Sequence, residues 1–143
     1  MIIAFCGHDS VPDYDKVREW LSCVLDPFLY EDELIFYLGG YGEFDRIAAS
    51  VVWQKKQQNS NAKSVLVLPY INRKYNTELH DYTVFPPIES VPPRYAISKR
   101  NEWMVFKADV VIAYVTHGWG GASETLEYAR RKKKRIIVYP KIE

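Results

Sequence analysis

The seven glycines of the 143-residue chain gather in three short segments. They stand at Gly7, at Gly39, Gly40 and Gly42, and at Gly118, Gly120 and Gly121. Each segment follows an apolar run and precedes a helical pattern. Glycine at such a turn lets a ligand approach the backbone, while the helix behind it offers free N–H groups and a positive dipole end. This arrangement predicts a site for a phosphate-bearing ligand; the alternative is that short turns simply need glycine.

Polar side chains accompany the last glycine segment and the helical pattern before it. Ser123 and Thr125 can donate hydroxyl groups to a phosphate, and Arg100 can pair with it through its planar fork of donors. Glu127 is placed to bind a ribose hydroxyl or to stabilise an oxocarbenium-like centre. The alternatives are helix capping for Ser123 and Glu127 and a solvated position for Arg100.

Imidazole and aromatic side chains flank the same segments. His8 and His117 can contact a ligand or titrate near neutrality, and the spacing of acids around them predicts no metal site and no cofactor. Trp119 lies between two glycines, so its ring either covers the ligand or packs against a second subunit in a homodimer or homo-oligomer. The Tyr41 ring can stack on a base, and Asp45 can bind ribose or cap a helix.

Five apolar runs rich in β-forming residues predict the strands that position these groups, at 1–6, 34–38, 64–69, 109–115 and 135–139. They are continuous rather than alternating, as in strands covered on both faces of a parallel sheet. Helical patterns follow Asp13 and cover 43–58, 93–107 and 122–133. Residues 82–85 offer a sixth strand within an otherwise long loop at 70–92. This alternation predicts one α/β domain over 1–143, a Rossmann-like three-layer sandwich with a mainly parallel sheet of five to six strands.

Composition narrows the function. Apolar residues make up 48% and charged residues 26% of the chain, which is typical of a globular domain. With 19 Lys and Arg against 18 Asp and Glu, the net charge of +1 disfavours nucleic acid or a membrane as the main partner. The run of six basic residues from Arg130 to Arg135 is typical of a solvated helix end. The two cysteines, the lack of a membrane-spanning run and the lack of a signal-peptide pattern favour the cytosol.

Neither GxxxxGK[ST] nor GxGxxG is present, which disfavours Walker-type ATP hydrolysis and ordinary NAD binding. Four short motifs point elsewhere instead: Cys6-Gly7-His8, the segment Gly39 to Asp45, Arg100-Asn101-Glu102-x-Met104, and Gly120-Gly121-x-x-x-Thr125 within Ala108 to Ala129. Together they resemble the SLOG superfamily, the Rossmann-like group of Smf/DprA proteins, LOG enzymes and YpsA-like proteins. The spacing from Gly120 to Thr125 is most similar to the YpsA-like branch.

The resemblance implies a domain that binds a nucleotide or an ADP-ribose-like derivative at its glycine loops, as a binder or sensor. It also implies a second possibility, because LOG enzymes cleave the N-glycosidic bond of nucleoside monophosphates with an Arg and a Glu that correspond to Arg100 and Glu127. The proline of the LOG loop is absent here, and Ser123-Glu124 replaces its Gly-Thr step. Two more functions stay open: a nucleoside deoxyribosyltransferase-like enzyme, and a pure interaction protein whose glycines serve only as turns.

Overall fold

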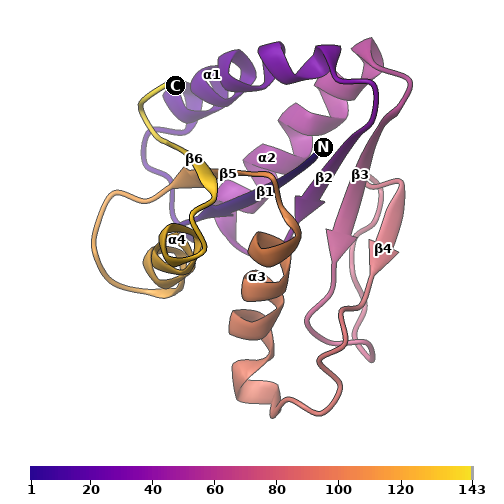
Figure 1. Ribbon diagram of the computed structural model, residues 1–143, viewed down its shortest axis with the longest axis vertical. Coiled ribbons are helices and arrows are strands. Elements are labelled where there is room, and N and C mark those ends of the chain that lie inside the picture. The colour runs from indigo at the N-terminus through magenta and orange to yellow at the C-terminus, as the bar shows by residue number, and fades with distance from the viewer. Residues whose placement is uncertain (143) are drawn as a thin grey trace.

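Six parallel strands form the sheet at the centre of the computed structural model, which describes residues 1–142 (Figure 1). The strands are β1 (Ile2–Gly7), β2 (Leu34–Leu38), β3 (Ala62–Val67), β4 (Tyr82–Val84), β5 (Val110–Tyr114) and β6 (Arg135–Val138). Their order across the sheet is β4-β3-β2-β1-β5-β6, and every neighbouring pair is parallel. The predicted α/β class is therefore confirmed, with the sixth strand in place and no antiparallel pair among the described residues.

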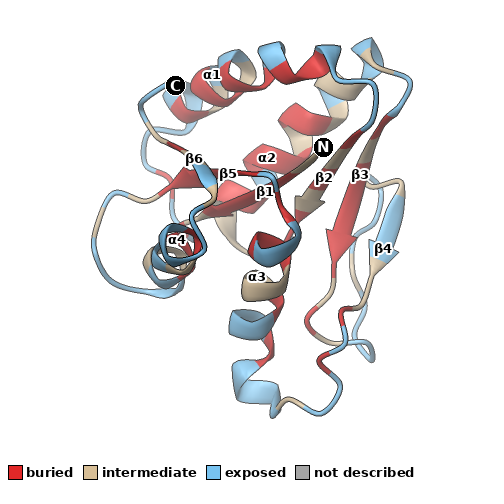
Figure 2. Cartoon of the chain, in the orientation of Figure 1, coloured by how far each residue is buried: buried red, intermediate tan, exposed pale blue. Residues whose placement is uncertain are grey.

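Helices cover both faces of the sheet and form the outer layers (Figure 1). The helices are α1 (Tyr14–Leu25), α2 (Gly42–Lys55), α3 (Ala96–Lys107) and α4 (Gly121–Arg131). One core contains the apolar faces of α1 and α2, and the other contains those of α3 and α4. Figure 2 shows buried residues in the central strands and on the inner sides of the helices, while β4 is largely exposed. The three-layer sandwich thus follows from amphipathic helices packing on strands that are apolar on both faces.

The ends of several elements differ from the predicted ranges. Short 3-10 turns replace the last residues of the second predicted helix, at Lys56–Gln58, and the first residues of the third, at Pro93–Tyr95. Proline favours the start of such a turn because it has no N–H to donate. The third strand begins two residues before the predicted 64–69, since Ala62 and Lys63 already pair with β2. Hydrogen bonding to the neighbouring strand determines where a strand begins and ends, and hydropathy indicates these ends only indirectly.

The order of the strands creates a switch point between β1 and β5. The chain moves outward from β1 through β2 and β3 to β4, and then returns to place β5 on the other side of β1. At the carboxyl end of this pair, Gly7 lies in register with Tyr114. The connections after β1 and β5 leave in opposite directions to helices on opposite faces. Such a switch point opens a crevice, which is where open α/β sheets bind ligands.

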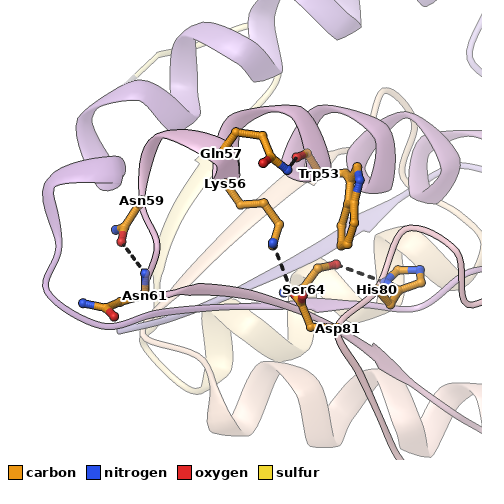
Figure 3. A network of polar contacts seen from close by, with 8 residues as sticks. All are labelled: Trp53, Lys56, Gln57, Asn59, Asn61, Ser64, His80 and Asp81. Carbon is orange, nitrogen blue, oxygen red and sulfur yellow. Dashed lines mark hydrogen bonds and ion pairs between the residues drawn. The ribbon is translucent and has the colours of Figure 1, made fainter.

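A buried polar network fixes β4 and the loop before it to the sheet (Figure 3). The Ser64 backbone N–H donates to Asp81 Oδ2 at 2.8 Å, and Ser64 Oγ lies 3.0 Å from His80 Nδ1. Lys56 Nζ lies 3.5 Å from the same carboxylate. Although a serine beside a histidine resembles a nucleophile and its base, Ser64 has 0% of its surface exposed. The network therefore holds the structure together, since a substrate has no route to the hydroxyl.

Candidate functional site

A cleft of about 440 Å³ lies at the switch point, where the first and last glycine segments meet. It is bordered by the ends of β1 and β2 and by the N-terminal parts of α2, α3 and α4. Eleven of the residues predicted to contact a ligand line it: Gly7, His8, Gly39, Tyr41, Asp45, Arg100, His117, Trp119, Gly120, Gly121 and Thr125. The structure thus brings together residues from separate stretches of the sequence, as expected for the carboxyl edge of a parallel sheet.

The N-terminus of α4 is open toward this cleft. Gly120 precedes the helix with a φ of +91°, and the first intrahelical bond runs from the Glu124 N–H to the Gly120 carbonyl at 3.0 Å. The N–H groups of Gly121, Ala122 and Ser123 have no acceptor among residues 1–142. Free N–H groups and a positive dipole end together make a site for an anion.

The N-terminus of α2, which follows the second glycine segment, is closed by the protein itself. The N–H groups of Glu43 and Phe44 donate to the carbonyls of Asp9 and His8, at 2.9 and 3.4 Å. Gly42 has a φ of +83°, and a Cβ there would lie 2.9 Å from the Asp9 Cα. Gly40 has a φ of +74° and, like Gly42, does not line the cleft. These two glycines serve the turn and its close packing, and two of the first N–H groups of the helix behind them are already bonded.

Arg100 is the central charged group of the cleft. It has 1% of its surface exposed, and its Nη1 donates to the carbonyls of Gly39 and Val67, both at 2.7 Å. Its Nε donates to Asn101 Oδ1 at 2.8 Å. Burial lowers the pKa of the guanidinium, and the nearby Asp45 carboxylate opposes that effect. Arg100 thereby ties α3 to the ends of β2 and β3, while Nη2 has no hydrogen-bond partner among the described residues.

Asp45 provides the opposite charge at the same end of the cleft. Its Oδ2 accepts from the Tyr41 backbone N–H at 2.9 Å. Burial raises the pKa of the Asp45 carboxyl to about 6, although the Arg100 guanidinium acts in the other direction. Burial, with a smaller effect of the Asp45 charge, also raises the pKa of the Cys6 thiol to about 12. Cys6 is therefore a protonated and unreactive thiol at neutral pH.

A stack of three rings forms the wall of the cleft near α4. The His8 and His117 rings are 3.7 Å apart between centroids, and those of His117 and Trp119 are 3.9 Å apart. His8 Nε2 accepts from the Thr116 backbone N–H at 2.9 Å, so the neutral ring carries its proton on Nδ1. Burial, reinforced by His117, lowers the pKa of His8. Trp119 ends the stack with 72% of its surface exposed, which leaves an indole face free for contact.

The remaining predicted residues lie beside the cleft. Gly118, Ser123 and Glu127 line a second hollow between α3 and α4, and Thr125 borders both cavities. Glu127 Oε1 accepts a hydrogen bond from Arg130 on the solvent side of α4. Thr125 Oγ1 donates to the Gly121 carbonyl at 2.9 Å. The structure therefore separates Glu127 from Arg100, the two residues that the resemblance to LOG enzymes pairs.

Several lining residues were absent from the predicted set of site residues. Asp9 and Ser10 follow the first glycine segment directly, and Asn101 follows Arg100. Their positions next to Gly7-His8 and Arg100 are the only sequence feature that indicates a place in the site. No group of three or more His, Cys, Asp and Glu side chains within residues 1–142 has the arrangement of a metal site. Nor is any helix in that range long and apolar enough to cross a membrane.

The sequence matches no family model and no curated protein. Solved structures with the same fold nevertheless exist. DNA processing protein A (DprA) from Streptococcus pneumoniae matches 95% of this chain with a TM-score of 0.67 and 18% identity. The molybdenum cofactor carrier protein from Chlamydomonas reinhardtii matches 96% with a TM-score of 0.65 and 14% identity. The chain shares the Rossmann-like fold of these structures.

The structures with this fold are larger than this chain. The chain spans 49% of the length of S. pneumoniae DprA and 75% of that of the carrier protein. DprA from Helicobacter pylori, described for its single-stranded DNA binding, matches at a TM-score of 0.64 and 16% identity, with 64% of its length covered. At these identities the comparisons establish the shared fold, and the activity has to be argued from the cleft.

Proposed function

We propose that this protein binds a nucleotide or a nucleotide-derived molecule such as an ADP-ribose-like compound, and acts as a binder or sensor in the cytosol. The observation that carries the proposal is the convergence of three unused features in one cleft of about 440 Å³. These are the open N-terminus of α4, the unpaired Nη2 of the buried Arg100, and the exposed face of Trp119. The spacing from Gly120 to Thr125 supports a YpsA-like ligand site.

The phosphate binds at the N-terminus of α4 in this proposal. Gly121 and Ala122 line the cleft with free N–H groups, and a Cβ at Gly120 or Gly121 would have no atom within 4 Å. Phosphate oxygens can therefore approach this backbone, as at other helix N-termini. The N-terminus of α2 is less available to the phosphate, because the N–H groups of Glu43 and Phe44 already donate to the carbonyls of Asp9 and His8.

Trp119 supports a ligand that also carries an aromatic base. One face of the indole is stacked on His117, which holds the ring in place, and most of its surface remains exposed. Stacking of a base on such a ring contributes about 1–3 kcal/mol. The same exposed ring is the natural contact for a second subunit, so the sensor can equally act as a homodimer or homo-oligomer.

The enzymatic alternative is a nucleoside monophosphate N-glycosidase or a nucleoside deoxyribosyltransferase-like enzyme. It needs Glu127 at the reacting bond with Arg100 as the positioning cation. The placement of Glu127 outside the cleft, bonded to Arg130, favours binding without turnover. If Glu127→Gln keeps the affinity for a nucleoside monophosphate but abolishes release of its base, the enzymatic alternative holds.

The test is a thermal-shift screen with nucleoside mono-, di- and triphosphates, ADP-ribose, cyclic ADP-ribose and NAD. A ligand at 100 times its Kd stabilises the fold by about 2.7 kcal/mol. Recovery of the intact ligand by mass spectrometry supports a binder, whereas free base with ribose phosphate supports the glycosidase. No shift with any compound refutes nucleotide binding and favours an interaction protein.

Two additions sharpen the screen. A short single-stranded oligodeoxynucleotide tests the expectation that no nucleic acid is bound, because H. pylori DprA is described for binding single-stranded DNA. Trp119→Ala is compared with Tyr30→Ala, which removes an aromatic ring that is 90% exposed and lies outside the cleft. Only the Trp119 variant is expected to show a smaller thermal shift than the wild type.

A further inference from the structure

Two polar atoms at the end of the cleft away from α4 have hydrogen-bonding capacity that the protein does not use. Arg100 Nη2 and Asp45 Oδ1 have no partner among residues 1–142, although Nη1 and Nε of Arg100 and Oδ2 of Asp45 are all bonded. Both side chains line the cleft, with 1% and 8% of each residue exposed. Among the described side chains, His117 Nδ1 is the only fully buried polar atom without a hydrogen-bond partner. Arg100 Nη2 and Asp45 Oδ1 are therefore not fully buried. Each keeps some exposed surface, and the cleft is the cavity that both residues line.

Gly39 lets these two side chains lie close against the backbone at the end of β2. A Cβ on Gly39 would lie 3.0 Å from Arg100 Nη2 and 3.1 Å from Asp45 Oδ2, tighter than most side-chain contacts. The backbone does not require glycine here, because a positive φ occurs at Gly40, Gly42 and Gly120 but not at Gly39. The missing side chain thus lets the Arg100 guanidinium and the Asp45 carboxylate both border the cleft beside Gly39, and we call this part of the cleft the slot.

The charges of the slot define the kind of group it fits. Arg100 contributes a cation and Asp45 an anion, so the slot has little net charge, in contrast to the positive end of α4. A second phosphate would meet the Asp45 carboxylate and be repelled. A neutral group that accepts one hydrogen bond and donates another would satisfy both free atoms.

We propose that the slot over Gly39 binds the ribose hydroxyls of the ligand, with Arg100 Nη2 donating to one hydroxyl oxygen and Asp45 Oδ1 accepting from the neighbouring O–H. This inference rests on the proposed nucleotide-binding function and makes Asp45 a specificity-determining residue for ribose over deoxyribose. Hydrogen bonds to charged groups are about twice as strong as neutral ones, which suits the discrimination of a single hydroxyl. The phosphate and the sugar then occupy opposite ends of one cleft.

Calorimetric titration of the full chain with ribonucleoside 5′-monophosphates and their 2′-deoxy and 3′-deoxy counterparts tests the inference. The wild type is expected to bind the ribonucleotide about tenfold more tightly than whichever of the two deoxynucleotides binds more weakly. One hydrogen bond to a charged group has an effect of this size. Asp45→Asn should reduce the affinity for the ribonucleotide to the affinity that the wild type has for this more weakly bound deoxynucleotide. The matched control, Asp32→Asn, changes an exposed carboxylate outside the cleft and should behave as the wild type.

Gly39→Ala provides a second variant, because its methyl group would displace the Arg100 and Asp45 side chains while the backbone conformation stays allowed. It should also lose the preference for ribose, with its fold verified by circular dichroism. Equal binding of ribo- and deoxyribonucleotides by the wild type would overturn the inference and leave the proposed function intact. The same holds if Asp45→Asn weakens both compounds equally. If no nucleotide binds the wild type, the proposed function and the inference are both overturned.

Discussion

The substitution Asp45→Asn removes a titrating carboxyl group from the interior. Comparing the variant with the wild type measures how much that group changes the free energy of unfolding. Burial raises the pKa of Asp45 from 3.8 to about 6, and each pH unit of that difference corresponds to about 1.36 kcal/mol. Between these values the folded protein binds more protons than the unfolded chain, so stability falls as the pH rises. Ionisation of Asp45 therefore lowers the free energy of unfolding by about 3 kcal/mol. This loss is absent below pH 4 and complete above pH 6.

Urea denaturation of the wild type and of Asp45→Asn between pH 3.5 and 7.5 measures this cost. The wild type should lose about 3 kcal/mol relative to the variant over that range. His8 and His80, whose pKa values are lowered by burial, titrate in both proteins and cancel in the difference. Parallel stability curves would refute the reasoning, because the carboxyl would then ionise as easily in the fold as in the unfolded chain.

Three further outcomes follow from the packing of the site. Gly7→Ala places a Cβ 2.3 Å from the Phe44 ring, so it should lower the free energy of unfolding by about 1–3 kcal/mol in urea; unchanged stability would contradict that contact. Trp119→Ala should change stability by less than about 0.5 kcal/mol but weaken nucleotide binding by about 1–3 kcal/mol in calorimetry, and unchanged affinity would exclude base stacking. The His8 ring should titrate below 6.5 by NMR, and its own contribution to stability should fall as the pH drops below that value; a midpoint at or above 6.5 would contradict its burial.

The central strands are predictable from sequence because they are buried on both faces. Continuous apolar runs therefore mark β1, β2 and β5, and the helices between them are marked by apolar stripes. Strand ends are less visible: Ala62 and Lys63 belong to β3 because they pair with β2, although their polarity resembles that of a loop. Pairing of this kind depends on the neighbouring strand and leaves little trace in local hydropathy.

The site is predictable only in part, because it depends on contacts between distant segments. The glycine segments indicate the carboxyl edge, but an arginine in a helical pattern usually points to solvent. Arg100 is buried because Gly39 leaves room for it and two carbonyls at strand ends accept hydrogen bonds from it. Glu127 lies two residues beyond Thr125, which is about 200° around the axis of α4, so it does not face the cleft that Thr125 borders.

The place of β1 in the middle of the sheet also bears on how the chain is made. Its register with β5 joins Ile3 to Val110, so the two partners are separated by most of the sequence. Until the ribosome has released β5, β1 can pair only with β2 and remains an apolar edge strand. Such edges are sites of aggregation during synthesis. The same late pairing that completes the cleft therefore ends the period in which the nascent chain most needs a chaperone.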